Sequence, residues 1–247
     1  MATRTRRRRG VLDPERVVRT LVQLQGRIDE RFPGAGLAAV CGDLTDTARK
    51  TQQRAVELGR PYIGLRLLVV IVALAALAIQ AYLARTVDWG SIGRRNDAVG
   101  LTQGLESAVN LAILAFGAIW FLARLETRLK RARTLRHLYE LRAFAHVIDM
   151  HQLTKDPSII LRADDQRTPS SPVRAMNEFQ LARYLDYCSE MLALTAKLAA
   201  LYAARTRDAE VMDAINDVEV LTSDLGRKIW QKITIISQLK EGEGTPP

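Results

Sequence analysis

Cysteine is scarce in this chain of 247 residues, and histidine is almost as rare. The two cysteines, Cys41 and Cys188, stand far apart and form no C-x-x-C pair. A disulfide framework and a cysteine-rich zinc site both need several cysteines at short spacings, so the sequence excludes both of these. We expect two reduced thiols that serve as small apolar side chains.

The motifs of common enzyme classes are also missing. The chain has no G-x-x-x-x-G-K-[ST] phosphate loop, no G-x-G-x-x-G after a strand, no G-x-S-x-G and no H-E-x-x-H. Those motifs supply phosphate cradles, activated serines or zinc ligands. Without them we expect a protein that is not an enzyme and needs no cofactor and no metal.

Strand patterns are absent too, because no stretch alternates apolar and polar residues convincingly. Apolar residues instead recur three and four apart, which predicts an all-α protein. Asp13 and Pro14 resemble a helix start, and Pro33 and Gly34 a helix end. We expect helices at Pro14 to Phe32, at Leu37 to Leu58, from the second apolar block to Leu153, from Val173, and at Asp208 to Leu239.

Two long apolar blocks are the strongest positive signal. The first is LLVVIVALAALAI, residues 67–79, and the second is AVNLAILAFGAIWFLA, residues 108–123. A bilayer core needs about 20 apolar residues in a helix, and both blocks reach that length with their flanks. We therefore predict a membrane hairpin of two transmembrane helices with a cytoplasmic helical bundle; two buried helices of a soluble bundle are the alternative.

The positive charge lies mainly beside these blocks. The net charge is +9, and basic residues precede the first block and follow the second, whereas acidic residues offset them in the connecting loop. The positive-inside rule then places both termini in the cytoplasm, in a bacterial inner membrane. Nucleic-acid binding would need basic and aromatic residues on a common face, so we expect none. The residues expected to meet anionic lipid headgroups are Arg60, Arg66, Arg124, Arg128, Lys130, Arg131 and Arg133.

These signals divide the chain into successive parts. The arginine-rich start lacks the apolar run of a signal peptide, so we expect it to be a basic arm. The expected parts are a disordered arm (1–12), N-terminal cytoplasmic helices (13–60), the first span (61–85), an outer loop (86–104), the second span (105–124), a cytoplasmic helical extension (125–153), a loop (154–172), a C-terminal antiparallel helical pair (173–240) and a disordered tail (241–247).

All three histidines fall just after the second span, and two of them lie in a dense polar segment. His146 and Asp149 are three apart and share a helical face, while His151 points elsewhere unless the helix ends there. The segment could cap the helix and bind the following loop, could sense protons or a ligand, or could contribute metal ligands. The spacing does not choose between these three.

Three polar residues interrupt the spans, namely Gln80, Glu106 and Asn110. A hydrogen bond between the two spans explains Gln80 and Asn110 most simply. The alternative is a pore lined by Asn110 and Glu106 from several copies.

The order of parts from Leu37 to Leu153 resembles two-span bacterial effector families of nucleotide-signalling conflict systems. The resemblance is one of architecture and implies pore formation. The sequence itself favours a membrane-anchored protein whose cytoplasmic bundle self-associates or holds a protein partner, because apolar stripes run through Leu181 to Tyr202 and Val211 to Ile236. A small homo-oligomeric channel gated by its cytoplasmic helices is the alternative, and an enzyme site around His146, Asp149 and His151 comes third.

Overall fold

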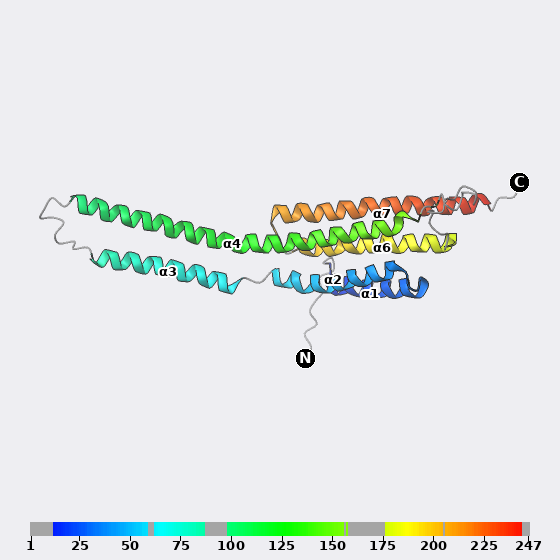
Figure 1. Ribbon diagram of the computed structural model, residues 1–247, viewed down its shortest axis with the longest axis horizontal. Coiled ribbons are helices and arrows are strands. Elements are labelled where there is room, and N and C mark those ends of the chain that lie inside the picture. The colour runs from blue at the N-terminus through cyan, green and yellow to red at the C-terminus, as the bar shows by residue number, and fades with distance from the viewer. Residues whose placement is uncertain are drawn as a thin grey trace, which may run out of the picture. The chain divides into compact units, whose positions relative to one another are not determined.

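The computed structural model describes residues 12–58, 62–86, 98–155, 157, 176–204 and 206–243. These residues form helices and no strands, which confirms the all-α prediction. In chain order (Figure 1) the helices are α1 (Pro14–Arg31), α2 (Gly36–Leu58), α3 (Ile63–Thr86), α4 (Ala98–Leu153), α6 (Glu178–Ala203) and α7 (Ala209–Glu243).

Helix starts follow local capping chemistry. Asp13 caps α1 as predicted, since its carboxylate accepts a hydrogen bond from the Glu15 amide at 3.1 Å, with Pro14 in the first turn. The start of α6 differs from the prediction, because Met176 and Asn177 are not helical. Asn177 and Gln180 each accept a hydrogen bond from the other's backbone amide, at 2.8 and 3.0 Å. This capping box sets the start of α6 five residues later than Val173.

Two other predicted boundaries also shift, because the helices extend further than expected. α4 begins at Ala98, so residues 98–104 of the predicted outer loop are helical, and α7 runs to Glu243, so residues 241–243 of the predicted tail are helical. Helix propagation adds a hydrogen bond for each residue, and Gly100 and Gly104 weaken it by about 1 kcal/mol each without stopping it. Most of the predicted arm and of the loop at 154–172 lies outside the described residues.

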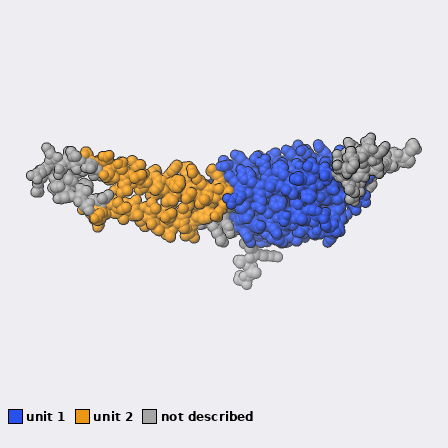
Figure 2. All heavy atoms as spheres, viewed as in Figure 1, with its two compact units in different colours: residues 1–59, 134–247 blue, residues 60–133 orange. Residues whose placement is uncertain are grey.

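The chain divides into two compact units (Figure 2): residues 1–59 with 134–247, and residues 60–133. We call the first the bundle unit. It contains α1, α2, the last part of α4, α6 and α7. The second, which we call the apolar unit, contains α3 and the first part of α4.

The hydrophobic core of the described residues lies in the bundle unit. α1 packs on α2, and α6 packs against α7, α1 and α2. From α4 the core takes Leu138, Leu141, Ala145 and Ile148, all fully buried. These four recur three and four residues apart, which places them on one face of α4.

The apolar stripes of α6 and α7 are buried inside the same chain. α6 and α7 pack as an antiparallel pair, which a spacing of three and four residues also favours. The stripes that motivated self-association therefore face their own bundle and are not available to a partner. The buried residues are Leu181, Leu185, Cys188, Leu192, Ala199, Tyr202, Val211, Ile215, Val218, Leu225, Ile229 and Ile236.

Candidate functional site

The apolar unit exposes its apolar side chains, whereas the bundle unit buries them. Its windows at Ile63–Tyr82 and within Leu105–Leu153 are long and apolar enough to cross a membrane, and neither window buries its residues in the described structure. Leu77 is 67% exposed and Phe116 is 71% exposed. Two helices with exposed apolar side chains on most of their surface are stable in a solvent that is itself apolar.

A polar contact between the apolar blocks joins the two helices of this unit. The Gln80 amide Nε2 donates a hydrogen bond of 3.0 Å to the backbone carbonyl oxygen of Ala108 on α4. Asn110 and Glu106 are exposed and take no part in that contact. The structure thus places the three predicted polar residues differently: Gln80 bonds between the helices, and the other two lie on an outer face four residues apart.

A polar cluster ties the start of α3 to α4 just past the second apolar block. Glu126 accepts hydrogen bonds of 3.3 Å from the Tyr62 backbone amide and from Arg66 Nε, and Lys130 Nζ lies 2.8 Å from its carboxylate. Arg133 donates a hydrogen bond of 2.6 Å to the Tyr62 hydroxyl. The Glu126 carboxylate therefore pairs with Arg66 and Lys130, two of the residues predicted to meet lipid headgroups, and joins the two helices.

Other basic residues predicted to meet lipid headgroups lie near this cluster on α4. The Arg124 guanidinium lies 4.7 Å from the centroid of the Trp120 ring, a cation–π contact typical of an aromatic belt. Arg128 is exposed and Arg131 is half-buried. Arg60 lies outside the described residues.

The predicted histidine cluster does not converge. His146 is exposed, whereas Asp149 is half-buried and accepts a hydrogen bond of 2.5 Å from Gln152 Nε2. The His151 ring instead packs on α2, where its Cε1 lies 3.0 Å from the position a Cβ on Gly36 would take. Among the described residues no group of three or more His, Cys, Asp or Glu side chains could hold a metal ion.

The histidine that does enter a polar network is His137. Arg54 on α2 places its Nη1 2.9 Å from His137 Nδ1 and 3.7 Å from the Glu140 carboxylate, which also lies 3.6 Å from the His137 ring. Thr47 donates a hydrogen bond of 3.3 Å to Glu140. Burial, and then the charge of Arg54, lowers the pKa of His137 below 6.5.

Two buried hydroxyls lie close to this network without a hydrogen-bond partner among the described residues, those of Thr51 and Tyr202. Other buried threonines satisfy themselves: Thr45 and Thr195 donate to the carbonyl oxygens four residues earlier, at 2.8 and 2.9 Å. Burial raises the pKa of Tyr202 above 10, and the neighbouring Thr51 hydroxyl and then the charge of Arg54 act in the opposite direction.

The sequence patterns did not predict this network between α2 and α4. Thr47, Thr51 and Arg54 are four and three residues apart, so they form a polar stripe on one face of α2. A polar stripe opposite the His137–Glu140 pair, which is three residues apart on α4, was the available signal. Its geometry fits a specific contact between helices.

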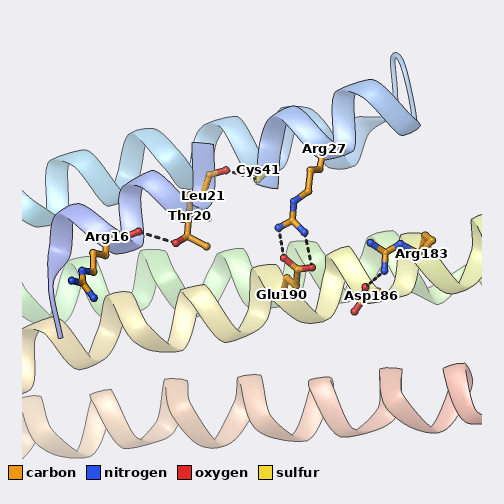
Figure 3. Close-up of polar contacts among 8 residues, drawn as sticks. All are labelled: Arg16, Thr20, Leu21, Arg27, Cys41, Arg183, Asp186 and Glu190. Atoms are coloured by element: carbon orange, nitrogen blue, oxygen red, sulfur yellow. Dashed lines mark hydrogen bonds and ion pairs between the residues drawn. The ribbon is translucent and has the colours of Figure 1, made fainter. Parts of the chain in front are cut away.

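Both cysteines are fully buried and free. Burial raises the pKa of each thiol to about 12, so neither is a thiolate near neutral pH. Cys41 makes a long contact of 3.8 Å to the Leu21 carbonyl oxygen (Figure 3).

A shallow cavity of about 340 Å³ opens between α1 and α6, lined by Arg27, Glu30, Arg31, Arg183 and Tyr187. Figure 3 shows that two of its guanidinium groups are already paired with carboxylates. Arg27 reaches across to Glu190 with contacts of 2.6 and 3.2 Å, and Arg183 lies 2.7 Å from Asp186 on its own helix. The cavity is therefore a polar seam between two helices rather than an open anion site.

Comparisons with protein-family models, with curated proteins and with solved structures found no match to this chain.

Proposed function

We propose that the chain is an integral membrane protein of two spans, α3 and the first part of α4, whose helical bundle self-associates or holds a protein partner at the membrane surface. It acts without catalysing a reaction. Its expected location is a bacterial inner membrane, with both termini in the cytoplasm.

The observation that carries this proposal is the contrast between the two units. The bundle unit buries its apolar stripes, whereas the apolar unit exposes side chains such as Leu77 and Phe116. Each exposed apolar Å² costs about 25 cal/mol in water, and a bilayer removes that cost. The Glu126 cluster and the Trp120–Arg124 contact lie beside the apolar block, where polar headgroups would meet them.

Membrane fractionation and thiol labelling test the proposal directly. The chain should stay in the bacterial membrane fraction after an alkaline carbonate wash. A cysteine at Ser91 should react with a membrane-impermeant maleimide in intact cells, and a cysteine at Thr245 only after lysis. Cys41 and Cys188 are buried, so the unmodified chain provides the background. Release by carbonate, or labelling with the opposite sidedness, contradicts the proposal.

A pore is the second candidate, and the placement of two polar residues favours it. Glu106 and Asn110 lie on an exposed face of an otherwise apolar helix, and lipid cannot satisfy their hydrogen bonds. Copies that turned these faces toward one another would line a polar path. Ion flux in liposomes that changes in Asn110→Leu or Glu106→Gln would support a channel, and silent bilayer recordings across pH would contradict it.

A further inference from the structure

The span part of α4 carries a row of residues that its own chain leaves exposed. The row, which we call the span row, comprises Glu106, Asn110, Ile113, Gly117 and Trp120. Ile113 is 63% exposed and Trp120 is 52% exposed. The intervals are four, three, four and three residues, so the five residues share one face of α4 with the period of helices that pair side by side.

Two members of the span row are suited to a helix contact rather than to lipid. Lipid chains offer no hydrogen bond to the exposed Asn110 amide, whereas the Gln80 amide on α3 is already satisfied inside the chain. Glycine weakens a helix interior, yet apart from its own helix backbone no described atom lies within 4 Å of the position a Cβ on Gly117 would take. Packing inside the chain therefore does not require this glycine. Small residues and amide side chains are the features by which helices associate in a bilayer.

The apolar block of α3 lacks both features. From Leu67 to Ile79 it contains no polar residue and no glycine, so its exposed side is suited to lipid. We propose that the span row is covered by the span row of a second copy, with the two α4 spans parallel in one bilayer. The inference rests on the membrane placement proposed above and names a surface for self-association. Because α4 runs unbroken out of the span, the parallel direction keeps the bundle units of both copies on one side of the membrane.

Hydrogen-bond complementarity selects a second copy as the partner. A two-fold axis along the bilayer normal sets Asn110 opposite Asn110, and an amide has both donors and an acceptor, so each side chain donates to the other. The same axis sets Gly117 opposite Gly117, where the missing side chains let the two backbones approach closely. The two Glu106 carboxylates repel each other, but they lie at the outer end of the span, where water and salt screen them. The pair is dry along Ile113 and Gly117, unlike the polar path of a pore.

Substitutions in the full-length chain test the pairing. In mild detergent, light scattering over a dilution series should show that Asn110→Leu weakens association about tenfold, because the interhelical hydrogen bonds are lost. Asn110→Gln keeps the amide and should retain association. Gly117→Leu should weaken association at least tenfold, because its side chain holds the backbones apart. Gly64→Leu is the matched control, since the Cβ position on Gly64 is equally open but lies on α3, and it should have no effect. Leucine is apolar, so none of these three leucine variants impairs insertion.

Oxidative cross-linking in membranes tests the register. Ile113→Cys alone should form covalent dimers, because a parallel pair in register sets position 113 against itself. Leu74→Cys, on the exposed side of α3, should not, and the unmodified chain with its buried cysteines gives the background. Absence of Ile113→Cys dimers, or unchanged association of Asn110→Leu and Gly117→Leu, overturns the inference and leaves self-association through another surface. A monomeric unmodified chain removes self-association as well, and release by carbonate removes the membrane placement itself.

Discussion

Removing one buried hydroxyl should stabilise the bundle unit. Tyr202 is fully buried, and its hydroxyl lies beside that of Thr51 without completing a hydrogen bond to it or to any other described residue. An unpaired buried hydroxyl costs about 1–3 kcal/mol relative to water. Tyr202→Phe removes the hydroxyl and keeps the ring, so it leaves the packing of α6 unchanged. We expect the free energy of unfolding to rise by about 1 kcal/mol, which in a chain of this size raises the melting temperature by about 2–4 °C.

The assay is thermal unfolding of the full-length chain in mild detergent, followed by circular dichroism. Tyr184→Phe is the matched control, since Tyr184 is also buried on α6 but its hydroxyl is not one of the buried, unpartnered atoms. The control should leave the melting temperature unchanged within about 1 °C, the shift of less than 0.5 kcal/mol expected away from such features.

A substitution at Thr51 tests whether the two buried hydroxyls are unpaired or hydrogen-bond to each other. If each hydroxyl is unpaired, Thr51→Val should also stabilise, and the double variant Thr51→Val/Tyr202→Phe should show the sum of both effects. If the two hydroxyls satisfy one another in solution, each single variant should lower the melting temperature and the double variant should be nearly neutral. A fall in melting temperature for Tyr202→Phe refutes the reasoning from an unpaired hydroxyl.

Three further outcomes are expected from the bundle unit. Leu185→Ala should lower the free energy of unfolding by about 2–5 kcal/mol, because the side chain is fully buried; chemical denaturation measures this, and a loss below about 1 kcal/mol contradicts the placement of the core. A double-mutant cycle of Arg27→Ala and Glu190→Ala should give a coupling of about 0.5 kcal/mol, since Arg27 is 42% exposed and water screens the pair; no coupling at low salt would refute the contact. Since the folded state lowers the pKa of His137, the unfolded chain binds its proton more readily, so the contribution of His137 to stability should be constant above about pH 6.5 and fall as the pH decreases below it. His137→Gln should reduce that pH dependence, and an unchanged slope would contradict it.

Much of the fold could be predicted because it depends on local patterns. Asp13 before Pro14 specifies a helix start, and the spacing of Leu138, Leu141 and Ile148 specifies the buried face of α4. The start of α6 was missed because Asn177 and Gln180 form a cap only together. A capping box lies within four residues of sequence, so a closer reading of that segment could have found it.

The polar network was beyond the same reasoning for a different reason. His146, Asp149 and His151 are neighbours in sequence, and proximity along the chain suggested a cluster. On a helix, a residue five positions further on turns to a different face, so His146 is exposed while His151 packs against Gly36. His137 acquires its partner from Arg54, 83 residues earlier, through the packing of α2 against the α4 segment. No local pattern encodes that distance.

The same limit applies to the apolar faces of the long helices. The last part of α4 is apolar on two faces, one with Leu138, Leu141 and Ile148 and the other with Tyr139 and Met150. Periodicity alone detects both stripes and cannot tell which of them the chain buries. α6 and α7 pack against each other, and α6 also packs on α1 and α2. The regularly spaced apolar residues of α6 and α7 are therefore buried within a single chain. Tyr139 and Met150 stay exposed on the bundle unit, so the folded structure, and not the spacing, shows which apolar face of α4 is buried.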